Sequence, residues 1–203
     1  MELLSVKYKT ILKELLIKHE GLVCEIYQCS VGKNTIGVGR NLDAQGLSIK
    51  EVEALISNNN HRVNILHKDN MNMSEMWTLA EIANDTEHVK TLCRGGITTE
   101  EALYLLDNDI DLVELQLMRN IDFIGRLDEI RKVVLCDMAF NLGITGLLKF
   151  KRMLKAIELG NYQVAADEML QSKWARQVGQ RATELADIMR QGWNDTGQSA
   201  DRS

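Results

Sequence analysis

Apolar and polar residues alternate with a helical period at the start of the chain. Leucine, isoleucine and tyrosine recur every three or four residues, at Leu4, Tyr8, Ile11, Leu12, Leu15 and Leu16. This spacing predicts an amphipathic helix. Gly21 is the kind of residue that ends a helix in a left-handed conformation. We therefore expect a first helix whose last residue is Glu20.

The pattern then changes to short runs of β-forming residues. The runs EIYQC and NTIGVG, at residues 25–29 and 34–39, are separated by SVGK. They predict a β-hairpin with Gly32 in its turn. Gly37 and Gly39 within the second run indicate a bulge or the close approach of another group to the backbone.

Helical patterns dominate the remainder of the chain. Ser48 with Glu51, and Thr98 with Glu101, have the spacing of capping boxes that start helices. The clearest helix is expected at residues 97–120, with an apolar stripe at Leu103, Leu106, Ile110, Val113, Leu117 and Met118. Other helices are expected at residues 47–58, 74–92, 127–142, 146–159, 161–171 and 179–192.

Helix therefore far outweighs strand, and the expected fold class is α+β, mostly helical. Trp174 and Trp193, near helix ends, are interpreted as core anchors. No repeat or composition break divides the chain, so one domain is expected over residues 1–203. We place the first helix, the hairpin and additional helices in residues 1–96, the helical remainder in 97–195 and a flexible tail in 196–203.

Composition excludes several classes of function. The formal net charge of −5 disfavours generic nucleic-acid binding, which rewards a surplus of lysine and arginine. The four cysteines form no CxxC pair and no cluster with histidine, which argues against a zinc site. Charged residues interrupt the N-terminal run every few positions, so we expect neither a signal peptide nor a membrane anchor.

One short segment combines an acid, a thiol and a hydroxyl, namely Glu20, Cys29 and Thr35. Singly, these are most often a surface charge, a small core residue and a β-former. Together, EGLVCEIYQCSVGKNTIGVGRNL resembles the active-site segment of phage lysozymes, the muramidases of the T4 type. That family carries a Glu, an Asp or Cys nine positions later, and a Thr six positions further on. Glu20, Cys29 and Thr35 match this spacing.

The resemblance continues downstream. GITTEEALYLLDNDI resembles the start of the family's long helix between two lobes, and RKVVLCDMAFNLGITGLLKFKRML is similar to its central C-terminal helix. AADEMLQSKWARQVGQRATELADIMRQGWND resembles its closing helices. The resemblance implies a lysozyme-like fold, with a small hairpin lobe and a larger helical lobe. Residues 42–95 depart from the family pattern, and a lid, a docking surface or neutral elaboration are all open interpretations.

The implied activity is hydrolysis of the β-1,4 bond between N-acetylmuramic acid and N-acetylglucosamine in peptidoglycan, without a metal or organic cofactor. Such cleavage needs a proton donor, here Glu20, and a group opposite that activates water or stabilises the oxocarbenium-like centre. Cys29 could place or deprotonate the water, or attack the anomeric carbon directly. We favour the water route, because the family prototype inverts and Thr35 can orient a water molecule.

The resemblance implies further roles. Arg181 falls where the family has an arginine that pairs with and orients the catalytic Glu. Phe140 matches a cleft aromatic, and sugar contacts are expected at Asn41, Met153 and Glu168, where residue types differ from the prototype. His19 precedes Glu20 but is not assigned as a general base, because its side chain projects about 100° around the helix.

The implied biological role is that of an endolysin that lyses a bacterial host. The expected partner is the peptidoglycan glycan strand, with no nucleic acid and no stable membrane insertion, and we expect a monomer. The protein would stay in the host cytoplasm until a separate pore-forming protein releases it, or travel in a virion. The rival interpretation is a non-catalytic glycan-binding or virion structural protein on the same fold, favoured by the acidic balance and the missing Asp.

Overall fold

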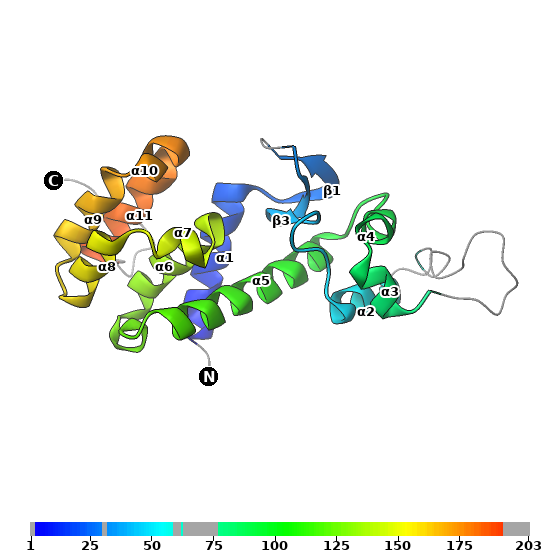
Figure 1. Ribbon diagram of the computed structural model, residues 1–203, viewed down its shortest axis with the longest axis horizontal. Helices are drawn as coiled ribbons and strands as arrows, with labels where there is room; N and C mark the ends of the chain where they lie inside the picture. Colours follow the sequence, from blue (N-terminus) through cyan, green and yellow to red (C-terminus); the bar gives the residue numbers. More distant parts are fainter. Residues whose placement is uncertain (1–2, 30–31, 59–61, 63–76, 193–203) are drawn as a thin grey trace, which may run out of the picture. The chain divides into compact units, whose positions relative to one another are not determined.

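A computed structural model describes residues 3–29, 32–58, 62 and 77–192 (Figure 1). The chain forms two compact units: unit 1 comprises residues 1–19 and 109–203, and unit 2 comprises residues 20–108. Helix α1 (Val6–Glu20) passes from unit 1 to unit 2 at its last residue, and α5 (Thr99–Asn120) passes from unit 2 to unit 1 in its middle. The fold is α+β and mostly helical, as expected. The domain boundaries drawn from the sequence stay predictions, and Trp193 and the tail lie outside the described residues.

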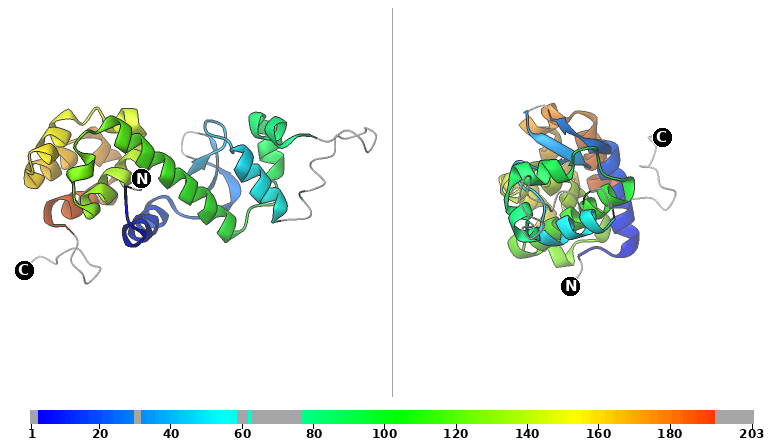
Figure 2. Two further views of the ribbon diagram at one scale, coloured as in Figure 1. Left: turned by 90° about the horizontal axis from the view of Figure 1, so that it is seen from below. Right: turned by 90° about the vertical axis from the view of Figure 1, so that its right-hand side faces the viewer.

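Unit 2 begins with a small antiparallel sheet, which Figure 2 shows from two further sides. Strand β1 (Val23–Gln28) pairs with β2 (Asn34–Gly37), and β2 pairs with β3 (Arg40–Asn41). The predicted hairpin is thus confirmed, and β3, only two residues long, is an addition to it. Gly21 has φ +78° and ends α1 in the left-handed conformation.

The helices of unit 2 are α2 (Ile49–Ser57), α3 (Leu79–Asn84), α4 (Thr86–Leu92) and the first half of α5. Both predicted capping boxes form: Ser48 and Glu51 exchange hydrogen bonds, as do Thr98 and Glu101. The expectation of one helix over residues 74–92 is wrong within its described part. The chain is extended at Asp85, whose carboxylate accepts hydrogen bonds from two backbone amides and caps α4.

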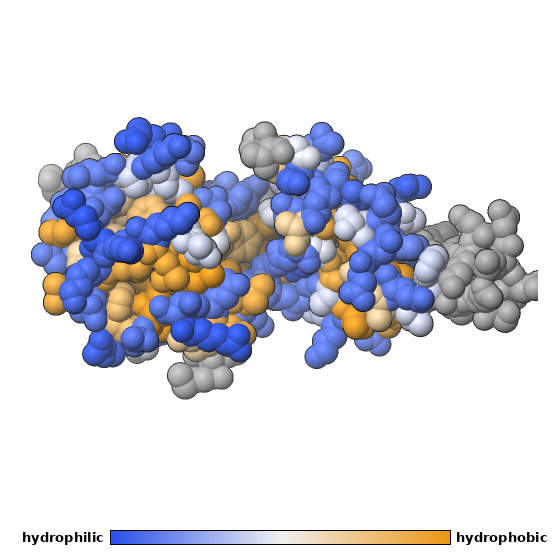
Figure 3. Space-filling view, viewed as in Figure 1, coloured by the Kyte–Doolittle hydropathy of each residue, from blue (hydrophilic) through white to orange (hydrophobic). Residues whose placement is uncertain are grey.

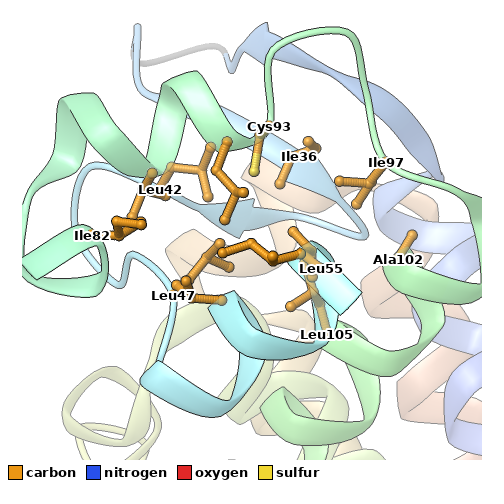
Figure 4. Close-up of a cluster of buried hydrophobic side chains, with 13 residues drawn as sticks. Ile36, Leu42, Leu47, Leu55, Ile82, Cys93, Ile97, Ala102 and Leu105 are labelled. Atoms are coloured by element: carbon orange, nitrogen blue, oxygen red, sulfur yellow. The ribbon is translucent and has the colours of Figure 1, made fainter. Parts of the chain in front are cut away.

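The core of unit 2 lies between the sheet and these helices (Figure 4). Its buried side chains include Ile36, Leu42, Leu47, Leu55, Ile82, Cys93, Ile97, Ala102 and Leu105. Five of these nine, from Leu42 to Cys93, belong to the atypical segment 42–95. The described part of that segment is therefore structural, because the sheet would lose most of its apolar cover without it.

Unit 2 also buries two arginine–glutamate pairs. Arg40 binds both carboxylate oxygens of Glu51, at 2.8 and 3.2 Å, and Arg62 binds both of Glu101, at 2.6 and 3.1 Å. Each arginine also donates to two backbone carbonyl oxygens. Each buried charge thus has an opposite charge and further hydrogen bonds, as burial requires.

Unit 1 is helical throughout its described part. After the second half of α5 come a 3-10 turn η2 (Ile124–Arg126), α6 (Glu129–Leu142), α7 (Ile144–Leu147), α8 (Lys151–Glu158), α9 (Tyr162–Leu170), α10 (Lys173–Val178) and α11 (Gln180–Gln191). Helix α9 packs against α8 and α11, and α11 also packs against α6. The single helix expected over 146–159 is wrong, because the chain leaves the helix between Leu147 and Lys151, and α10 was not expected.

Buried residues otherwise follow the predicted pattern closely. Of the expected stripe on α5, Leu103 and Met118 are only half-buried, whereas Leu105 is buried instead. Trp174 is 4% exposed and donates to Asn141 Oδ1 at 2.9 Å, which confirms it as a core anchor. Within the described ranges, no helix combines the length and the apolar composition needed to cross a membrane.

Candidate functional site

Glu20 occupies the last position of α1 and is half-buried. The backbone of Gly39, which follows β2 with φ +74°, lies directly against it: a Cβ on Gly39 would be 3.6 Å from Glu20 Oε2. The close backbone approach expected at this glycine is therefore confirmed. A residue with a side chain would strain the backbone here, and its Cβ would be in van der Waals contact with the carboxylate.

Tyr27, on β1, is influenced electrostatically by both Glu20 and Cys29. Burial raises the pKa of Tyr27, and the negative charges of Glu20 and of a Cys29 thiolate raise it further. Both groups therefore lie within electrostatic reach of the Tyr27 hydroxyl. Tyr27 was not predicted from the sequence as a site residue. Its position two residues before Cys29 in an alternating strand was the signal that could have found it.

Cys29 and Thr35 lie at the same end of the hairpin. The Cys29 amide donates to the carbonyl of Lys33 at 3.0 Å, just beyond the last strand pair, and Thr35 is the cross-strand partner of Tyr27. Cys29 is half-buried, and no disulfide joins it to Cys24. Thr35 is 3% exposed, and its hydroxyl donates to the Lys33 carbonyl at 3.1 Å. A hydroxyl that donates in this way can still accept a hydrogen bond.

Asn41 is the cross-strand partner of Thr35 on β3. Its side-chain oxygen accepts a hydrogen bond from the Ala44 amide at 3.0 Å and so closes the turn that follows the strand. The amide nitrogen of the side chain is a donor that this turn does not use.

Unit 1 contains a cavity of about 940 Å³ between the α7–α8 and α9–α10 segments. It is lined by Leu142, Gly146, Lys149, Phe150, Lys151, Arg152, Met153, Glu168, Gln171, Ser172, Lys173, Trp174 and Gln177. The expected sugar contacts Met153 and Glu168 thus line one cavity. Phe140 is half-buried near the end of α6 and is not among the lining residues. On the face of unit 1 seen in Figure 3, hydrophobic surface gathers over α6, α7 and α8, with hydrophilic residues around it.

The cavity combines aromatic and basic groups. Phe150 and Trp174 meet edge to face, with ring centroids 6.1 Å apart. Glu168 forms an ion pair of 2.9 Å with Arg152, which is almost fully exposed. The remaining charged residues of the lining are lysines, at positions 149, 151 and 173. An aromatic wall beside several cations suits a ligand that has apolar faces and negative charge.

Arg181, on α11, is buried against Asp137 of α6. Its Nε donates to Asp137 Oδ1 at 2.8 Å and its Nη2 to the Asp137 backbone oxygen at 3.2 Å. The expected pairing of Arg181 with Glu20 stays a prediction. Asp137 was missed, although an acid within the apolar run VVLCDMAF is a recognisable signal of a buried charge.

His19 completes this buried cluster. Its Nδ1 lies 2.9 Å from Asp137 Oδ2 and its Nε2 lies 3.2 Å from Glu184 Oε2. Burial alone would lower the pKa of His19, but its hydrogen bonds and Asp137's charge raise it above 6.5. Glu184 also binds Lys18, with Nζ–Oε1 at 2.6 Å. Among the described residues, no group of three or more His, Cys, Asp or Glu side chains could hold a metal ion.

Comparisons with known proteins agree with the resemblance seen in the sequence. The family model described as Phage lysozyme matches residues 67–190. Two proteins of Dictyostelium discoideum, Probable T4-type lysozyme 1 and 2, are 27% and 25% identical over 184 and 181 residues, which cover 89% of this chain and 94% of each relative. The Pre-baseplate central spike protein Gp5 of Enterobacteria phage T4 is 26% identical over 187 residues, which cover 88% of this chain and 27% of Gp5.

Proposed function

This chain belongs to the phage lysozyme family, and on that premise we propose that it hydrolyses the β-1,4 bond between N-acetylmuramic acid and N-acetylglucosamine in peptidoglycan. Family membership makes it a glycoside hydrolase by kind. The observation that carries the finer proposal is the arrangement in unit 2. Glu20 lies against the Gly39 backbone, and Cys29 and Thr35 lie at the same end of the hairpin, where the Cys29 amide donates to Lys33 and Thr35 pairs with Tyr27.

Glu20 is the proposed proton donor. Cleavage of a glycosidic bond requires a proton on the leaving oxygen while positive charge develops on the sugar ring. A half-buried carboxyl group at the end of a helix can deliver that proton. Arg181, by the family resemblance, is proposed to orient this carboxyl group.

Cys29 and Thr35 are proposed to act on the opposite side of the sugar. Because the Thr35 hydroxyl donates to a backbone carbonyl, it would accept a hydrogen bond from the attacking water and so fix the direction of the water's lone pair. Cys29 would then place or deprotonate this water, giving inversion. Direct attack by the thiolate, giving retention, is the alternative.

The proposed glycan contacts lie in both units. Asn41 offers its side-chain amide from unit 2, while Met153 and Glu168 line the cavity of unit 1, and Phe140 is proposed as a cleft aromatic. The lysines around that cavity supply local positive charge for an anionic wall despite the net charge of −5.

The proposed biological role is host-cell lysis as an endolysin, released from the host cytoplasm through a pore made by another protein. A virion-associated role is the second candidate. It is favoured by the likeness to Gp5, a pre-baseplate central spike protein of a phage. A non-catalytic glycan-binding protein of the virion would share this location but would release no sugar.

Glu20→Gln tests the proposed activity. Glutamine keeps the shape of the side chain but cannot donate the proton, so release of reducing sugar from peptidoglycan should fall at least about 100-fold. Clearing of a cell-wall suspension should fall equally. Wild-type protein that releases no sugar, or a Gln variant that releases as much as wild type, would refute the proposal.

Two glycines of the hairpin provide a matched test of where Glu20 acts. Gly39→Ala and Gly32→Ala both place alanine at positive φ, which costs about 1–2 kcal/mol each. Only at Gly39 would the new Cβ meet Glu20, because nothing lies within 4 Å at Gly32. We expect comparable losses of stability and a loss of kcat confined to Gly39→Ala. Equal activities would show that Glu20 tolerates displacement.

Cys29 variants separate the two mechanisms. Cys29→Asp should retain activity and Cys29→Ala should be severely impaired, and NMR of the first-formed anomer distinguishes inversion from retention. Normal turnover by the alanine variant would show that the thiol takes no part in catalysis.

A further inference from the structure

His19, the residue before Glu20, joins the last turn of α1 to other helices of unit 1. The His19 side chain is 5% exposed, and its two ring nitrogens face carboxylates from two different helices, Asp137 of α6 and Glu184 of α11. Asp137 is fully buried and is also held by Arg181. The end of α1 is therefore tied to two helices that follow it by more than a hundred residues.

Both contacts can be hydrogen bonds only when the imidazole carries two protons. A neutral imidazole has one N–H donor, so one of the two carboxylates would then face a ring nitrogen lone pair. Asp137 and Glu184 favour the imidazolium, whereas burial and Arg181 oppose it, and the balance raises the pKa of His19. Lys18 Nζ donates to both carboxylate oxygens of Glu184, including the Oε2 that faces His19.

We propose that His19 is a positioning residue for Glu20, which holds the end of α1 in place while it is an imidazolium and releases it when it loses a proton. The inference rests on the proposed role of Glu20. It does not require His19 to touch the substrate. Successive residues of a helix are separated by about 1.5 Å along the axis and about 100° around it, so His19 can face the core while Glu20 faces away.

The chemical consequence is a link between the charge of His19 and turnover. Proton donation depends on the position of the donor, and a displacement of about 1 Å can cost up to about 100-fold in rate. As pH rises through the pKa of His19, the imidazole loses one of its two hydrogen bonds. One of the two carboxylates then faces a nitrogen lone pair of the ring. An alkaline limb in kcat should follow that ionisation, with little change in KM, because sugar binding does not use His19.

The first test compares the same substitution at two histidines. His19→Gln cannot titrate and can donate to only one of the two carboxylates. Its kcat should be about tenfold lower than wild type below the alkaline limb. The part of the limb that follows the His19 ionisation should disappear, whereas the part due to loss of the Glu20 proton should remain. His88→Gln is the matched control, because His88 lies in α4 of unit 2, next to Trp77 and Asp85. It should retain the wild-type profile.

The second test shifts the pKa of His19 without replacing His19 itself. Glu184→Gln removes a group that raises the pKa of His19, so the alkaline limb should move to lower pH. NMR titration of the His19 ring should move with it. Lys18→Gln breaks the same Lys18–Glu184 ion pair but leaves the Glu184 charge, so its limb should not move to lower pH. This pair of variants keeps the test available if His19→Gln does not fold.

The outcomes separate this inference from the proposed function. Active wild-type protein together with an unchanged pH profile in His19→Gln, or a limb that moves independently of the His19 titration, overturns the positioning role alone. Wild-type protein that releases no reducing sugar overturns the muramidase proposal and this inference with it.

Discussion

In unit 2, Arg40 and Arg62 are each buried against one glutamate and two backbone carbonyls, whereas in unit 1 the buried Asp137 is shared by Arg181 and His19. The first arrangement contains only cations that keep their charge at every pH a protein survives. The second contains a histidine, which loses its charge as pH rises through its raised pKa. Among the described residues, the buried charges of unit 2 therefore include no cation that titrates, whereas those of unit 1 include one, His19.

The difference determines how each unit responds to pH. Burial opposes ionisation of Glu51, but Arg40, the Ser48 amide and Asn108 outweigh it and hold the pKa of Glu51 below its ordinary value. A lowered pKa gives stability that is present above the ordinary pKa and is lost in acid. The raised pKa of His19 acts in the opposite sense, so stability is present below about 6.5 and is lost as pH rises through the folded value.

The largest expected effect is the loss of one partner of a unit 2 pair. Arg62→Met leaves the buried carboxylate of Glu101 without its cation and should lower the free energy of unfolding by about 3–5 kcal/mol. Chemical denaturation at pH 7 measures this. Adding Glu101→Gln removes the stranded charge while a side-chain oxygen can still cap α5 at Thr98, so the double variant should recover part of the loss. No recovery would contradict a charge-based origin.

Asp137→Asn makes the corresponding change in unit 1. The amide keeps the size of the side chain but removes the charge that Arg181 and His19 share. We expect a loss of about 2 kcal/mol, typical of a hydrogen bond to a charged group. The loss should be smaller than for Arg62→Met, because His19 can shed its proton and Arg181 still has the side-chain and backbone oxygens of residue 137 as acceptors. A larger loss in unit 1 than in unit 2 would reverse the comparison.

The pH dependence of stability is the third test. Between the unfolded and folded pKa values of His19, the free energy of unfolding should fall with rising pH, by at most about 1.4 kcal/mol per pH unit for one proton. His19→Gln should abolish this alkaline slope and leave the decline in acid, to which Glu51 contributes. Denaturation curves from about pH 2 to pH 9 give both slopes, and an unchanged alkaline slope would assign it to another group.

The smallest effects should be equal in the two units. Ser48→Ala and Ser172→Ala each remove the serine hydroxyl that accepts a hydrogen bond at the start of a helix, α2 in unit 2 and α10 in unit 1. Each should cost about 1 kcal/mol, with no dependence on pH. Unequal costs would show that the units differ in more than their buried charges.

Local signals in the sequence predicted most of the fold. The caps at Ser48 and Thr98, the stop at Gly21 and the hairpin all depend on residues within a few positions of one another, and all are confirmed. The helix predictions that were wrong concern residues that suit two local structures equally well. Asp85 can continue a helix or cap the next one, and only packing in the core of unit 2 decides between them.

The site was predicted less completely. The spacing of Glu20, Cys29 and Thr35 follows from local chain geometry and the family resemblance, and the sheet register places Thr35 opposite Tyr27. The partners of His19 could not be predicted in this way, because Asp137 and Glu184 are separated from it by 118 and 165 residues. No periodicity in a single sequence specifies which distant acid meets a given histidine.

The division of the chain into its two units also bears on how the protein is made. Unit 2 is continuous, residues 20–108, whereas unit 1 combines residues 1–19 with everything after residue 108. Because domains fold as they leave the ribosome, we expect unit 2 to be complete while α1 still lacks the helices it packs against. The buried leucines of α1, Leu12, Leu15 and Leu16, would stay exposed on the nascent chain until the rest of unit 1 has been synthesised, and a chaperone would have the largest apolar surface to bind during that interval.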